Sequence, residues 1–124
     1  MQPRFGLKGA GSTNWLTSQR MPVPAVNRIA ADKSARVLRL GKDDIVVLGQ
    51  GAETEIGSLK AAWLGSSGTK GYQSWRDEGW AWMRISSPGL NDVMSRLCAM
   101  DLAPDKFARD EIAQTRVGQL EAVL

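Results

Sequence analysis

The chain has 124 residues, of which 43% are apolar and 23% charged, proportions typical of one compact soluble domain and not of a disordered chain. It contains no histidine, which excludes Ser-His-Asp and Cys-His catalysis and every His-ligated metal site. A single cysteine, Cys98, excludes an internal disulfide and a multi-thiolate metal site.

The net charge of +3 is unevenly distributed. Residues 1–42 carry eight Lys or Arg and one acid, whereas residues 43–124 carry eight bases and twelve acids. A basic first third could meet nucleic acid or an acidic protein. The bases are dispersed without interleaved aromatic residues, so we favour a solvated face or a protein partner over nucleic acid. With no targeting signal and no apolar run of eighteen residues, we expect a cytoplasmic protein without a membrane partner.

The chain begins with a predicted strand and short helix. Residues 4–9 alternate as a strand, and Ser12 or Thr13 can cap a helix whose apolar residues are Trp15 and Leu16. Two prolines then end the helix, because neither can donate a backbone hydrogen bond.

The middle of the chain predicts a β-hairpin and a second helix. Residues 35–40 and 44–48 form the hairpin, and the second strand is a continuous apolar run typical of a central position in a sheet. Residues 53–64 have helical spacing. One side of that helix carries Ile56, Leu59, Lys60 and Trp63.

A second hairpin is predicted from residues 72–75 and 80–86, joined by a turn at 76–79. An amphipathic helix then begins at Leu90, and residues 112–117 and 120–124 read as a closing strand or pair of strands. The apolar stripe of this helix consists of Leu90, Val93, Met94, Leu97 and Cys98.

The two strand–helix units resemble each other, which indicates an internal duplication. A shift of 78 positions places Leu7 on Ile85, Gly11 on Gly89, Trp15 on Val93, Leu16 on Met94 and Pro24 on Leu102. We therefore predict an α+β fold for residues 1–124 as a single domain, with duplicated β–α units, antiparallel hairpins and a sheet covered by helices on one face.

Two glycine-rich segments invite a phosphate-binding interpretation, and neither supports it well. Residues 9–14 lie between a strand and a helix, but Asn14 stands where a dinucleotide fingerprint needs its third glycine. Residues 65–70 place Lys70 after Thr69, and they follow a helix where a P-loop must open one. We predict a plain turn and a surface loop.

The remaining reactive side chains also favour structural roles. Cys98 lies on an apolar stripe, where a thiol is inert core packing. Four acids near residue 105 lack the spacing of a calcium loop, so we expect solvated carboxylates around a turn. These acids are Asp101, Asp105, Asp110 and Glu111.

Trp75, Trp80, Trp82 and Arg84 form the most distinctive cluster, because the last three share one face of the predicted strand. The residues suit core packing, a protein interface, or stacking on a flat cofactor such as a pterin or flavin. We take them as partner-interface candidates and predict no catalytic, cofactor-binding or metal-ligating residue in the chain.

The segments C-A-M-D-L-A-P-D-K-F at 98–107 and A-Q-T-R-V at 113–117 resemble the γ subunit of heterotetrameric sarcosine oxidase. That family shows a helix ending in Asp-Leu-x-Pro-x-x-Phe, followed by Ala-Gln-Thr and an apolar strand. Here Asp110-Glu111-Ile112 replaces the Gly-x-Cys often found before Ala-Gln-Thr. Family members continue further, which implies either a chain truncated at its C-terminus or a sheet edge at 120–124 that a partner completes.

The resemblance implies a fold like half of the folate-binding domain of the glycine cleavage T protein. It also implies a small subunit without its own cofactor, packed against large flavoprotein subunits. Those partners would hold FAD, FMN, NAD and tetrahydrofolate and oxidatively demethylate sarcosine or another N-methyl amino acid. The alternatives are a small folate-binding one-carbon transfer protein and a nucleic-acid-binding module.

Overall fold

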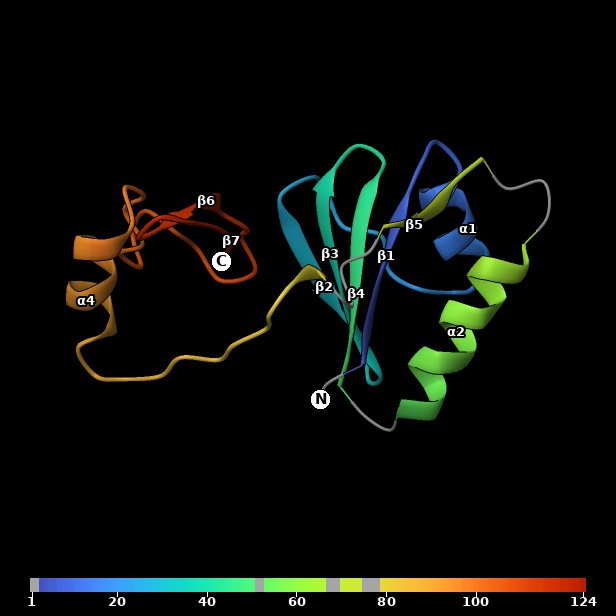
Figure 1. The fold of residues 1–124 in the computed structure, drawn as a ribbon, viewed down its shortest axis with the longest axis horizontal. Helices are drawn as coiled ribbons and strands as arrows, with labels where there is room; N and C mark the ends of the chain where they lie inside the picture. The colour runs from blue at the N-terminus through green and yellow to red at the C-terminus, as the bar shows by residue number, and fades with distance from the viewer. Residues whose placement is uncertain (1–2, 51–52, 67–69, 75–78) are drawn as a thin grey trace. The chain divides into compact units, whose positions relative to one another are not determined.

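A computed structural model describes residues 3–50, 53–66, 70–74 and 79–124 of the chain. Its contacts group the chain into two compact units, Met1–Trp80 and Ala81–Leu124. Each unit has its own helices and strands (Figure 1). No helix among the described residues is long and apolar enough to span a bilayer.

The first unit is built on a five-stranded antiparallel sheet of order β2-β3-β4-β1-β5. Its strands are β1 (Arg4–Lys8), β2 (Arg28–Ala31), β3 (Ala35–Gly41), β4 (Asp44–Gly49) and β5 (Tyr72–Ser74). The predicted β3–β4 hairpin is confirmed. The apolar run of β4 lies between β1 and β3, so its central position is also confirmed.

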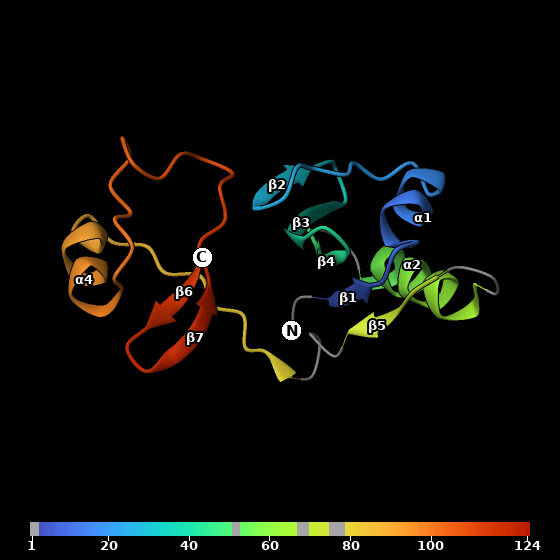
Figure 2. The same ribbon diagram turned by 90° about the horizontal axis from the view of Figure 1, so that it is seen from above.

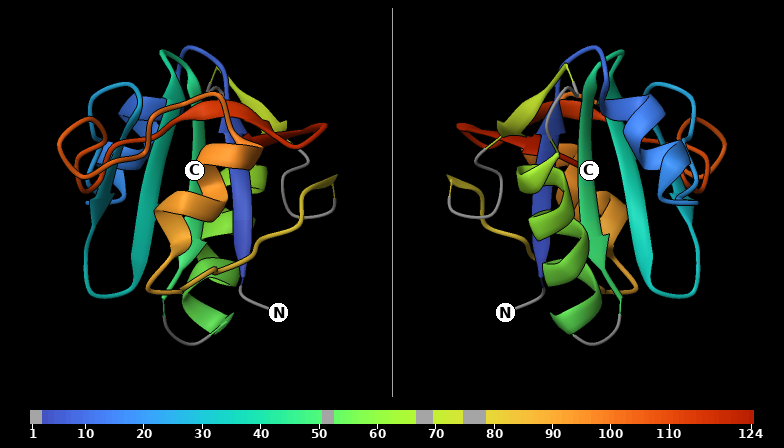
Figure 3. Two further views of the ribbon diagram at one scale, coloured as in Figure 1. Left: turned by 90° about the vertical axis from the view of Figure 1, so that its left-hand side faces the viewer. Right: turned by 90° about the vertical axis from the view of Figure 1, so that its right-hand side faces the viewer.

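Two helices, α1 (Ser12–Ser18) and α2 (Glu53–Gly65), lie on the same side of this sheet (Figure 2). The right-hand view of Figure 3 looks onto the face that they cover. Both helices lie close to their predicted bounds. The predicted placement of helices on one face of a sheet is confirmed for the first unit. In α1 the N-cap is Gly11 without a side-chain bond, so the predicted Ser12 or Thr13 cap is wrong.

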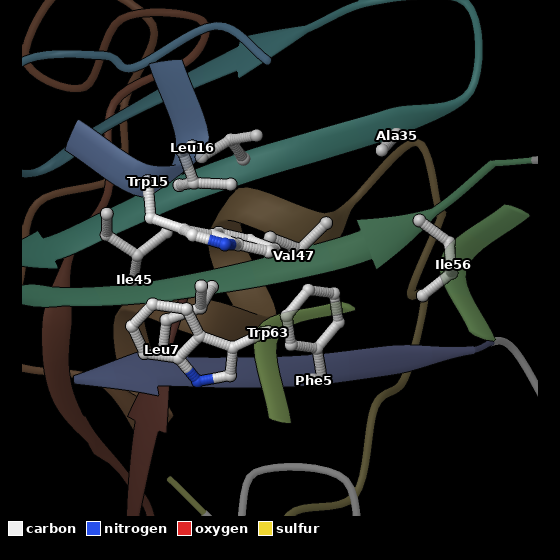
Figure 4. Packing of buried hydrophobic residues seen from close by; sticks show 10 residues of the cluster. Phe5, Leu7, Trp15, Leu16, Ala35, Ile45, Val47, Ile56 and Trp63 are labelled. Carbon is white, nitrogen blue, oxygen red and sulfur yellow. The ribbon is translucent and has the colours of Figure 1, made fainter. Parts of the chain in front are cut away.

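The core lies between the sheet and these helices (Figure 4). Cross-strand register places Phe5 opposite Val47 and Leu7 opposite Ile45, so alternate side chains of β1 and β4 point to one face. The helices contribute Leu16, which is fully buried, and two tryptophans. The rings of Trp15 and Trp63 pack edge to face with centroids 4.9 Å apart, which joins α1 to α2.

The predicted strand at 80–86 is wrong, because residues 80–87 form neither helix nor strand. β5 pairs instead with β1, where Gly6, Leu7 and Lys8 lie opposite Ser74, Gln73 and Tyr72. The predicted turn at 76–79 and Trp75 fall largely outside the described residues. β5 therefore forms its strand pairing with β1 and not with residues 80–86. The alternating pattern that suggested a hairpin does not determine which strands pair in the sheet.

The second unit contains α4 (Leu90–Leu97) and a hairpin of β6 (Gln114–Val117) and β7 (Leu120–Val123). Both the amphipathic helix and the closing pair of strands are therefore confirmed. The internal duplication stays a prediction. Its helix exists as α4, but the counterpart of the buried Leu7 is Ile85, which is 59% exposed and lies in no strand.

Candidate functional site

The glycine turn after β1 is occupied by the protein's own backbone. Gly9 donates its N–H to the Asp43 carbonyl at 2.9 Å, and Gly11 donates to the Lys70 carbonyl at 2.7 Å. A dinucleotide fingerprint offers such amides to a pyrophosphate. Here they hold the turn against two other loops, and the predicted place of the segment between a strand and a helix is confirmed.

Close backbone approach explains why glycine is needed in this turn. Gly9 has a φ of +117°, and a Cβ there would lie 2.6 Å from the Cα of Gly71 and from the Lys70 carbonyl oxygen. A Cβ on Gly71 would in turn lie 2.4 Å from the Trp63 ring. Because Gly9 and Gly71 have no Cβ, the β1–α1 turn, the residues before β5 and α2 can pack closely together.

The second glycine-rich segment follows α2, and its residues 67–69 lie outside the described structure. Its described end, Lys70, supplies the carbonyl that accepts from Gly11. The segment therefore ends a helix and braces a turn, and it does not open a helix as a P-loop must.

Cys98 follows α4 and is buried. Its Sγ lies 3.9 Å from the Thr115 Oγ1 on β6, and its backbone N–H donates to Met94. The cysteine thus packs between the helix and the hairpin of the second unit. The predicted core role is confirmed.

The acidic cluster near residue 105 serves local turns. An Asp101 oxygen accepts from the Ala103 N–H at 3.0 Å, and a Glu111 oxygen accepts from the Ala108 N–H at 2.8 Å. Such bonds are typical of carboxylates that stabilise turns. Among the described residues no group of three or more potential ligands is placed to hold a metal ion.

Several bases of the first third make contacts inside their own unit. The Arg39 guanidinium donates to the carbonyls of Pro24 at 3.2 Å and Lys42 at 2.9 Å. The Lys8 ammonium lies 3.7 Å from an Asp44 oxygen. These contacts tie loops and strands of the first unit together.

Trp80 and Trp82 lie at the surface, with 40% and 37% of their area exposed. The first of the three roles considered, core packing, is therefore wrong for both, and the buried tryptophans are Trp15 and Trp63. Arg84 is also exposed. Trp75 lies outside the described residues, so its grouping with the other three stays a prediction.

The same stretch of chain exposes Met83 at 73% and Ile85 at 59%, two residues that the sequence analysis did not select. Together residues 80–85 form an apolar segment, called the exposed segment below. In the sequence these residues alternate in the way that is typical of a paired strand. In the structure that pattern marks surface.

The outer side of α4 is a second apolar surface that the sequence analysis assigned to the core. Met94 and Cys98 are buried, as predicted, but Val93 is 54% exposed and Leu97 is 47% exposed. Leu120 on β7 is 74% exposed. The predicted stripe of α4 is therefore only partly buried.

No protein-family model and no curated protein sequence matches the chain. Among solved structures, a chain of the heterotetrameric sarcosine oxidase from Corynebacterium sp. U-96, in complex with pyrrole 2-carboxylate, is similar, with a TM-score of 0.71 and 21% sequence identity. The similarity covers 99% of this chain and 65% of that chain. At this identity it shows a shared fold.

Proposed function

We propose that this chain is a noncatalytic subunit of a hetero-oligomeric, flavin-dependent oxidase or dehydrogenase of sarcosine or another N-methyl amino acid. The observation that carries the proposal is the shared fold, at a TM-score of 0.71 over 99% of the chain, with a chain of a heterotetrameric sarcosine oxidase. The motifs at 98–107 and 113–117 independently resemble the γ subunit of that family.

The chemistry of the described residues supports a noncatalytic role. The sequence has no histidine to act as a general base, and its one thiol, Cys98, is buried against Thr115. The amides of Gly9 and Gly11, which could cradle a phosphate, bond to the chain's own carbonyls. In this proposal the partner subunits hold FAD, FMN, NAD and tetrahydrofolate and carry out the reaction.

The apolar surface supports a subunit rather than a free-standing protein. The exposed segment and the outer side of α4 present large apolar residues that an isolated small protein would be expected to bury. The proposal assigns this surface to packing against large flavoprotein subunits, one of which carries a folate-binding domain.

The test is co-expression of this chain with the proteins encoded beside it, which the proposal expects to include flavoprotein subunits. We expect the chain alone to bind no flavin and to turn over no amine, and to co-purify with those subunits as an active complex when they are expressed together. Flavin absorbance and amine-dependent oxidation report the outcome. A chain that stays free of the flavoprotein subunits, or that oxidises an N-methyl amine alone, would contradict the proposal.

The exposed indoles of Trp80 and Trp82 favour one alternative, a folate-binding one-carbon transfer protein in which they stack on a pterin. A titration of the isolated chain with tetrahydrofolate, followed by tryptophan fluorescence, separates the two functions. Saturable quenching would support the alternative, and unchanged fluorescence would eliminate it.

A further inference from the structure

We draw no further inference here: the strongest candidate, the exposed apolar side of α4 formed by Val93 and Leu97, carries none, because nothing in the structure shows what covers it.

Discussion

Replacing Gly9 with alanine tests whether the first glycine turn is a packing element. Gly9 has a φ of +117°, a region that costs a residue with a Cβ about 1–2 kcal/mol. The new Cβ would also lie 2.6 Å from the Gly71 Cα and the Lys70 carbonyl oxygen. Because both are backbone atoms, a loop has to move, which adds a cost of similar size. We therefore expect Gly9→Ala to lower the free energy of unfolding by about 3 kcal/mol.

The assay is urea unfolding of the whole chain followed by circular dichroism, with a thermal scan alongside. For a unit of this size, about 3 kcal/mol corresponds to a fall of roughly 12 °C or more in the midpoint. The matched control is Gly57→Ala, because Gly57 lies inside α2 with no neighbouring atom within 4 Å of the added Cβ. That change should raise stability by about 0.5–1 kcal/mol.

The two substitutions add the same methyl group with opposite expected signs. A midpoint for Gly9→Ala at or above that of the unchanged protein would refute the packing role of the turn. A loss of stability in Gly57→Ala equal to that in Gly9→Ala would show that the close approach to Gly71 is not the cause.

Three further predictions follow from burial and hydrogen bonding. Leu16→Ala removes a fully buried side chain, so urea unfolding should show a loss of about 3 kcal/mol. In the second unit, Met94→Ala should lower the thermal midpoint, whereas Val93→Ala, at a position 54% exposed, should change stability by less than about 0.5 kcal/mol. Bonds from the Ser34 backbone N–H, and more weakly from the Ala35 N–H and the Ser34 hydroxyl, lower the pKa of Asp32. That carboxylate should therefore stabilise the fold above its ordinary pKa of 3.8 and lose this effect as the pH falls through the lowered pKa. The urea midpoints of Asp32→Ala and the unchanged chain should differ at neutral pH and converge in acid.

The core of the first unit could be predicted from sequence because its pattern and its environment agree. Phe5 and Leu7 alternate on β1, and the continuous apolar run of β4 lies between two strands. Helical spacing placed Ile56 and Trp63 on one side of α2, and both are buried. Hydrophobic periodicity predicts the buried residues correctly where the rest of the protein covers one face of a segment.

The strand β2 could not be predicted because its own residues carry little β signal. Arg28–Ala31 contains one isoleucine and two alanines, and it pairs along β3. The turn that aligns these strands depends on Asp32, whose Oδ1 accepts from the N–H groups of Ser34 at 2.8 Å and Ala35 at 2.9 Å. Tertiary pairing and a turn bond, not local preference, form this strand.

At the exposed segment the prediction was wrong in the opposite sense, because a strand was predicted and none is formed. Residues 80–85 have strong β preference, yet the structure places them in no strand. Val93 and Leu97 are exposed although they lie on the apolar stripe of α4. Helical spacing identifies an apolar face but does not show what covers it. In both places the sequence pattern identifies apolar residues that the structure leaves exposed.

The mass and the visible spectrum of the tagged chain, purified from its own organism under native conditions, test the central claim most directly. If the chain is a subunit without a cofactor of its own, native mass spectrometry should find it inside a larger assembly whose other subunits carry the flavin. A free protein that binds flavin or oxidises an N-methyl amine unaided would contradict the account.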